Sequence, residues 1–275
     1  MRGPCFRRCP INSSRALVLT AVAIAGLGCA GQAMAYRPFE ATDADVADSR
    51  TIEIEFGPAE FIAHGPDHAL QAPTLTVNLG LGGGYEFGVE GVNLVALKPE
   101  EGVPRMQLVD TGLALKHLLK RGGLQDAHGS SIAAEAVVLF PGRGRDHLGA
   151  EAGGIISNDS KTYVSHLELG VSRSPEGSSG AGAGLILETA DHRGWRPVAE
   201  LNLEGAQGEP PSKSVLIGSI YEAREGFSVD AGVRLGQSDG VRWTEVRAGF
   251  AYQIGPRGTA PLRHFAKFHL RRRRH

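Results

Sequence analysis

Apolar and polar side chains alternate with a period of two along most of the chain between Thr51 and Ile254, and the spacing of an amphipathic helix is almost absent. Because neighbouring side chains of a β-strand point to opposite faces, this alternation predicts strands with one apolar and one charged face. Twelve strands are predicted, at 51–56, 74–81, 85–94, 108–118, 132–140, 152–157, 162–172, 182–188, 196–204, 214–222, 227–235 and 244–254.

The charged faces allow two architectures. A soluble β-sandwich would turn its apolar faces inward, whereas a transmembrane barrel would turn them to lipid and its charges into the lumen. In the barrel interpretation, Ile52, Ile54 and Phe56 of the first run face lipid. The side chains expected to line the lumen are Glu53, Glu55, Glu86, Glu90, Asp110, Lys116, Glu135, His166, Glu168, Glu200, Asp230, Arg234, Glu245 and Arg247.

The connections favour the barrel. Those after the second, sixth and tenth runs are short, at 82–84, 158–161 and 223–226, whereas those after the third, fifth, seventh and ninth runs are longer and polar. Short periplasmic turns that alternate with longer outer loops are typical of outer-membrane barrels. The connections after the fourth and eighth runs are less regular. The sequence therefore predicts an all-β fold over residues 51–254, an antiparallel transmembrane barrel of about twelve strands with both ends in the periplasm.

Residues 1–35 have the pattern of a cleaved signal peptide. An apolar stretch at 16–30 is followed by Ala33–Ala35, a small-x-small site that predicts cleavage after Ala35. An N-terminal membrane anchor and a lipoprotein cut before Cys29 are the alternatives. The basic residues that precede the apolar stretch are Arg2, Arg7, Arg8 and Arg15.

All three cysteines of the chain, Cys5, Cys9 and Cys29, lie in this segment, so we expect an exported mature chain without disulfides. Because the formal net charge is −1, the chain lacks the large positive field that nucleic-acid binding needs. No run of ~20 apolar residues follows the first forty positions, which excludes a protein of several membrane helices.

Residues 36–50 read as a polar lead-in that precedes the first strand or enters the barrel mouth. The acids Asp43, Asp45 and Asp48 could bind Ca²⁺, but the spacing lacks the glycine and terminal glutamate of an EF-hand loop. His64 and His68 could form a metal pair, yet a solvated loop in the first connection is favoured because further ligands are missing. The glycines at 80–84 indicate a tight hairpin. No metal, no cofactor and no catalytic residues are predicted.

The chain resembles a bacterial family of outer-membrane barrels named for the meta-pathway of phenol degradation. The resemblance begins with "YRPFEATDADVADSRTIEIEF" at 36–56 and continues through "LTVNLGLGGGYEFGVEG" and "VDTGLALKHLL" to "FSVDAGVRLG". It covers about residues 36–254 and implies a barrel described as a transporter, without substrate residues that could be carried over. The chain departs from such barrels at its C-terminus, where residues 255–275 form a basic tail that ends in four arginines and a histidine. We expect this tail to be disordered.

The sequence thus predicts a non-enzymatic transporter or channel of the outer membrane for small solutes. The family name suggests an aromatic or hydrophobic solute, and the acidic lumen face favours neutral or cationic solutes over anions. The expected partners are the lipid bilayer, lipopolysaccharide and the outer-membrane assembly machinery, with no nucleic acid. A barrel without transport, a barrel enzyme at the outer leaflet and a soluble periplasmic β protein are the alternatives.

Overall fold

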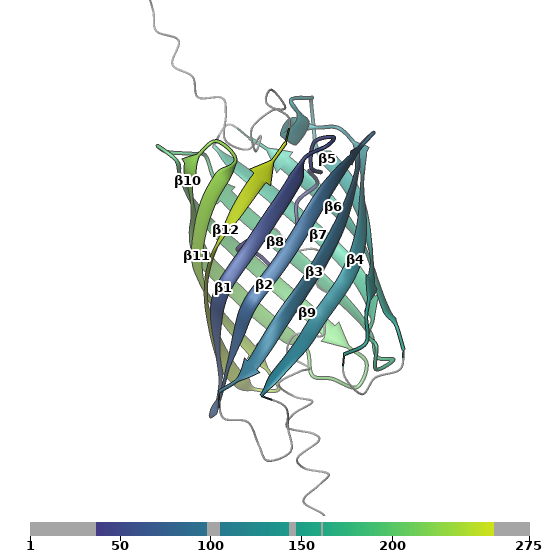
Figure 1. Ribbon diagram of the computed structural model, residues 1–275, viewed down its shortest axis with the longest axis vertical. Coiled ribbons are helices and arrows are strands. Elements are labelled where there is room, and N and C mark those ends of the chain that lie inside the picture. Colours follow the sequence, from purple (N-terminus) through teal and green to yellow (C-terminus); the bar gives the residue numbers. More distant parts are fainter. Residues whose placement is uncertain (1–36, 98–104, 143–146, 161, 256–275) are drawn as a thin grey trace, which may run out of the picture.

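A computed structural model describes residues 37–97, 105–142, 147–160 and 162–255. Twelve antiparallel strands form one closed barrel in which each strand pairs with its neighbours in sequence, and β1 closes the ring on β12 (Figure 1). The strands are β1 (Ile52–His64), β2 (Asp67–Gly82), β3 (Tyr85–Ala96), β4 (Met106–Lys120), β5 (Ser131–Leu139), β6 (Gly149–Asp159), β7 (Tyr163–Arg173), β8 (Ser179–Thr189), β9 (Trp195–Ala206), β10 (Ser212–Arg224), β11 (Phe227–Ser238) and β12 (Val241–Ile254).

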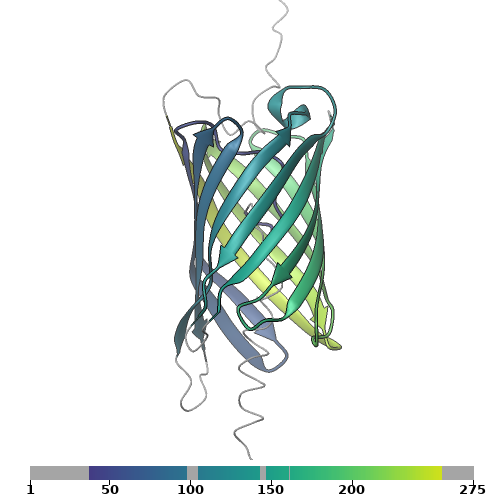
Figure 2. The same cartoon turned by 90° about the vertical axis from the view of Figure 1, so that its right-hand side faces the viewer.

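The predicted fold class is confirmed, and each of the twelve predicted runs lies on one strand, reaching at most one residue beyond its ends. The strands tilt across the barrel and are 9 to 16 residues long, enough to cross a bilayer at such a tilt (Figure 2). Among the described residues, no helix is long and apolar enough to cross a membrane. The predicted signal peptide lies outside the described residues, as does the basic tail beyond Gly255.

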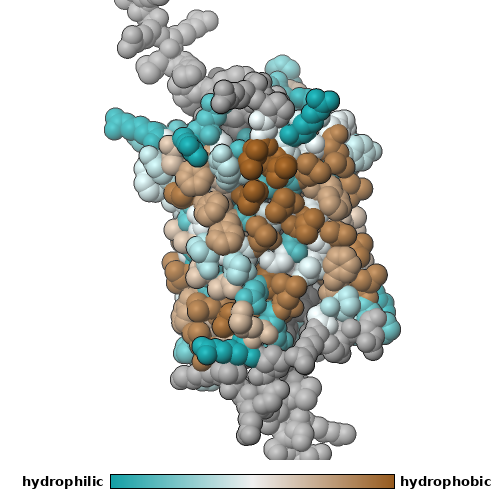
Figure 3. Space-filling model, in the orientation of Figure 1, coloured by the Kyte–Doolittle hydropathy of each residue, from teal (hydrophilic) through white to brown (hydrophobic). Residues whose placement is uncertain are grey.

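The apolar face of the strands is on the outside, which rules out the soluble sandwich. Side chains such as Leu169, Leu203 and Ile217 are 57%, 59% and 69% exposed, whereas the charged positions between them are buried. Figure 3 shows apolar residues over the middle of the barrel and hydrophilic residues near both ends. A surface of this kind is stable only against lipid or another apolar partner.

The two ends of the barrel differ. We call the end where β1 begins and β12 ends the terminal end, and the opposite end the loop end. Aromatic side chains gather on the strand ends at the terminal end, the position of an interfacial girdle in membrane barrels. They are Tyr85, Tyr163, Trp195, Tyr221, Phe227, Phe250 and Tyr252; Tyr85 stacks on His117, and several of the others contact one another.

The connections correct part of the prediction. Residues 57–73, expected as a long first connection, continue β1 and β2, which leaves only Gly65 and Pro66 in the turn. His64 and His68 therefore lie on paired strands and not in an open loop. The alternation of short and long connections is also incomplete, because β11 and β12 are joined by two residues at the loop end.

At the terminal end, the connection between β4 and β5 is the longer exception. It carries a short 3₁₀ helix, η1 (Gly123–Gln125), whose Leu124 packs inside the barrel mouth against Ala133, Ile155 and Ala44. The turn between β2 and β3 is a tight hairpin, as predicted. Gly82, Gly83 and Gly84 all have positive φ there, a conformation that suits glycine.

Candidate functional site

The lumen contains a segment of the chain's own N-terminal region. Residues 37–51, which we call the inner segment, lie between the walls before β1 begins, and Phe39, Ala41, Ala44 and Ala47 are buried. The acids of "DADVAD" belong to this segment. The sequence predicted that this region precedes the first strand or enters the barrel mouth, but it did not predict how deeply the region enters the lumen. In the structure its contacts reach strands all around the barrel.

Wall glutamates hold the inner segment by its backbone. Glu200 accepts hydrogen bonds from the amides of Glu40 (3.0 Å) and Ala41 (2.7 Å), and Glu168 accepts one from Thr42 at 2.9 Å. Glu55 and Glu86 accept from the amides of Arg37 and Ala47 in the same way. Carboxylates that accept from backbone amides replace the pairing that an irregular segment lacks. These glutamates therefore have a structural role that the alternation alone did not reveal.

Side chains complete the attachment near β1, β2 and β11. Arg37 donates to Glu60 at 2.7 Å and to both carboxylate oxygens of Asp230 at 3.2 Å, and it also reaches Thr74. Glu60 was not among the predicted lumen residues because it lies in the part of β1 that was taken for a connection. One guanidinium with two buried carboxylates forms a strong, geometrically specific contact.

Glu40 joins a second cluster of charges, formed with side chains of β9, β11 and β12. Its carboxylate lies 3.2 Å from Arg234 and 3.8 Å from Arg247, and it accepts from Asn202 at 2.8 Å. Burial alone would raise the pKa of the Glu40 carboxyl, but Arg234 and Arg247 outweigh burial and hold the pKa below its ordinary value.

Most of the predicted lumen residues are buried inside the barrel. Glu53 and Glu90 are half-buried, and the side chain of Asp110 is not among those that the structure describes. The structure brings many of them against the inner segment. The buried ones are Glu55, Glu86, Lys116, Glu135, His166, Glu168, Glu200, Asp230, Arg234, Glu245 and Arg247.

A Ser–His–Glu row lies near the terminal end and was not predicted. His166 Nδ1 is 2.8 Å from Ser157 Oγ, and His166 Nε2 is 2.9 Å from Glu188 Oε1. Glu188 also pairs with Arg196 at 2.5 Å, and Ser157 Oγ accepts from the Ala44 amide. The three side chains of the row are at most 1% exposed, so a substrate has no access to the hydroxyl. The row resembles a catalytic triad in composition but is a buried polar network.

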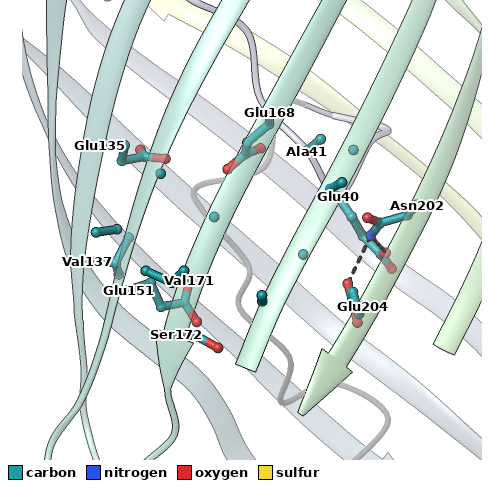
Figure 4. Close-up of a pocket in the computed structure, with 17 residues that line it drawn as sticks. Glu40, Ala41, Glu135, Val137, Glu151, Glu168, Val171, Ser172, Asn202 and Glu204 are labelled. Carbon is teal, nitrogen blue, oxygen red and sulfur yellow. Dashed lines mark hydrogen bonds between the residues drawn. The ribbon is translucent and has the colours of Figure 1, made fainter. Parts of the chain in front are cut away.

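Two cavities border the inner segment and share no lining residue. The loop-side cavity touches the segment at Glu40 and Ala41 (Figure 4), and the space between its lining atoms is about 540 Å³ when the part that opens to solvent is included. The terminal-side cavity touches the segment between residues 42 and 49, is lined by both acids and bases, and has about 1140 Å³ of space when the part that opens to solvent is included. No group of His, Cys, Asp and Glu suited to a metal ion occurs in the described ranges, and His64 and His68 accordingly belong to no such group.

Comparison with known proteins finds similar folds among solved structures but no related sequence. No family model matches the chain, and no curated protein matches it. Among solved structures, the COG4313 outer membrane channel from Pseudomonas putida F1 aligns with a TM-score of 0.57 at 9% identity, over 76% of this chain and 97% of that one. The KdgM porin (TM-score 0.48, 12% identity, 74% and 98% coverage) is a more distant match. The CymD monoaromatic hydrocarbon channel (0.46, 8%, 76% and 89%) is similarly distant.

At such identities the likeness establishes architecture only. Together with the apolar exterior and the aromatic girdle, it defines the chain as a transmembrane β-barrel of the outer-membrane type. The resemblance to the phenol-degradation family is not confirmed, because no family model matches.

Proposed function

We propose that the protein is an outer-membrane channel through which small solutes pass beside its inner segment. The observation that carries the proposal is the combination of an apolar exterior with a buried, charged interior that contains two cavities. A barrel with this distribution stabilises water and polar solutes inside a bilayer. The inner segment narrows that path, so passage should be slow and selective by size.

The charge of the lumen favours neutral and cationic solutes. Among the described buried side chains, carboxylates outnumber lysines and arginines. An interior of this sign lowers the energy of a cation and raises that of an anion. A narrower form of the proposal is that the solutes are aromatic or hydrophobic and that the protein belongs to the phenol-degradation family. This narrower form rests on the sequence resemblance.

The setting of this function follows from the sequence. We propose that residues 1–35 direct export and are removed after Ala35, and that the mature barrel is inserted by the outer-membrane assembly machinery into a bilayer with lipopolysaccharide. The terminal end would then face the periplasm. Fractionation and a gel shift on heating would test the location, since a folded barrel migrates differently before it is heated. Recovery with soluble periplasmic proteins would contradict it.

Liposome swelling tests transport itself. Proteoliposomes in an isotonic solution of a small neutral solute should swell at a rate that falls as the solute becomes larger. Swelling no faster than that of protein-free liposomes, for every solute, would favour a barrel without transport.

A hydrolase is the second candidate, because of the row Ser157, His166 and Glu188. Its burial under the inner segment opposes this function, and we propose that the protein is not an enzyme. A serine-directed fluorophosphonate should therefore fail to label the folded barrel, whereas stoichiometric labelling at Ser157 would support a hydrolase.

A further inference from the structure

The loop-side cavity is strongly acidic. Five glutamates line it, namely Glu40, Glu135, Glu151, Glu168 and Glu204, and the described lining contains no lysine or arginine. Figure 4 shows Glu135 and Glu151 on one side of the cavity and Glu204 with Asn202 on the other. The ionisable side chains that line this cavity are therefore all acidic.

The cavity exists because three neighbouring strands lack side chains at one level. Gly153 of β6 pairs with Gly170 of β7, which pairs with Gly182 of β8. The row continues at both ends with a carboxylate, because Glu135 pairs with Gly153 and Glu204 pairs with Gly182. A Cβ added at Gly170 would meet nothing closer than the Ala152 carbonyl at 3.6 Å, so there is free space above the row.

Glu135 is the carboxyl group of this cavity for which neither oxygen has a hydrogen-bond partner among the described residues. It is 4% exposed, it lines the cavity, and neither of its carboxylate oxygens has a hydrogen-bond partner in the described part of the chain. The opposing residue on β4 is Lys116, but its ammonium donates to Thr42 of the inner segment at 3.0 Å and lies 3.5 Å from Asp43. An unpaired buried carboxylate is costly, which a bound cation would relieve.

The other carboxylates are already engaged. Glu40 contacts Arg234, Glu168 accepts from the Thr42 amide, and Glu204 accepts from Asn202 at 2.9 Å. Glu151 also interacts with another group of the protein. They set the negative potential of the cavity, while Glu135 offers open acceptor oxygens.

We propose that this cavity is a binding subsite for small aliphatic ammonium ions, with Glu135 as their acceptor. An organic cation suits the site better than a metal ion, because the described residues contain no group placed to coordinate a metal. Val137 and Ala152 offer apolar surface to methylene groups, and the described lining has no aromatic ring on which an aromatic solute would stack.

This inference rests on the proposed function, which it deepens by naming a class of solute. Binding and passage are separate measurements, so the two can fail independently. If the amine binds and no solute crosses a bilayer, the channel function fails and the subsite stands. If solutes cross and the amine does not bind, the subsite fails alone.

Calorimetry on the detergent-solubilised barrel at pH 8 tests the subsite. The probe is 1,4-diaminobutane, and the neutral 1,4-butanediol and the anionic succinate are controls of similar length. The diamine should bind, and the diol and succinate should not. Equal binding of the diol, or no binding of the diamine, would overturn the proposal.

Two variants locate the site. Glu135→Gln keeps the shape and removes the charge, and should weaken diamine binding about tenfold or more, as expected for the loss of a charge-assisted hydrogen bond. Gly170→Leu leaves Glu135 in place and fills the cavity, and should weaken binding similarly. Glu209→Gln, in an exposed loop, is the matched control and should bind as the wild type does. A gel shift on heating shows that each variant is folded, and unchanged binding in folded Glu135→Gln would refute the assignment.

Discussion

Arg37 of the inner segment and Asp230 of β11 are 193 positions apart in the chain, yet the guanidinium donates to both oxygens of this carboxylate at 3.2 Å. The same guanidinium also donates to Glu60. One side chain thus ties the start of the inner segment to two strands of the wall, and it is the contact whose removal should most affect the path through the barrel.

Arg37→Ala should loosen the inner segment and increase single-channel conductance. The substitution leaves Glu60 and Asp230 buried without their partner, a loss of the kind that costs about 3–5 kcal/mol. Planar-bilayer recordings would measure the change. Arg105→Ala is the control, since Arg105 is exposed just before β4 and should leave the conductance unchanged.

Acidification should release the inner segment through Glu40. Arg234 and Arg247 hold the pKa of the docked carboxyl below its ordinary value of 4.5, so docking is stabilised above that value and loses this contribution as the pH falls through the lowered pKa. The other acidic groups near Glu40 are Glu200 and Glu204, both on β9.

A single thiol can report this release. The predicted mature chain has no cysteine, so Ala44→Cys, at a position that is 0% exposed, introduces a unique probe. Because only the thiolate reacts, its rate with a thiosulfonate is divided by the rate of free cysteine with the same reagent at the same pH, and this ratio should be low near pH 7 and higher below pH 4.5. Glu40→Gln should already react faster near pH 7, and identical pH profiles with and without that substitution would exclude a role for Glu40.

Ile217→Arg should destabilise the barrel by about 2–4 kcal/mol, the cost of a cation on the lipid face near the bilayer midplane. Ile217 is 69% exposed near the middle of β10, where lipid should surround it. Urea unfolding in lipid vesicles measures the loss. Leu148→Arg, directly before β6 at the loop end, should cost at most about 1 kcal/mol. Equal effects at both positions would argue against a membrane around the middle of the barrel.

Ser157→Ala tests the polar network. It removes the acceptor for the Ala44 amide and the partner of His166 Nδ1, so the barrel should lose about 1–3 kcal/mol of stability. Thermal unfolding followed by the gel shift measures this loss. A loss of esterase activity without a loss of stability would contradict the structural role.

The fold could be predicted from the sequence because a strand repeats every two residues. Glu53 and Glu55 alternate with Ile52, Ile54 and Phe56, and this local pattern needs no knowledge of distant residues. The first hairpin was predicted less well. Gly57, Pro58 and Pro73 interrupt the alternation, although β1 and β2 continue through them with a shift of register.

The contents of the lumen could not be predicted in the same way. No periodic signal marks the inner segment, and its position depends on partners such as Glu168 and Glu200, more than a hundred residues away. The cavity depends on Gly153, Gly170 and Gly182 meeting at one level, which follows from the register of three strands. Alternation placed Glu135 on the inner face but could not show that Lys116 binds the inner segment.

Ion selectivity tests the central claim, a solute path through an acidic lumen, most directly. Planar bilayers that contain the wild-type barrel, with a gradient of KCl across them, give a reversal potential whose sign reports the preferred ion. The account predicts measurable conductance with a preference for potassium over chloride, and a larger conductance for Arg37→Ala. No conductance from either protein, or a preference for chloride, would contradict it.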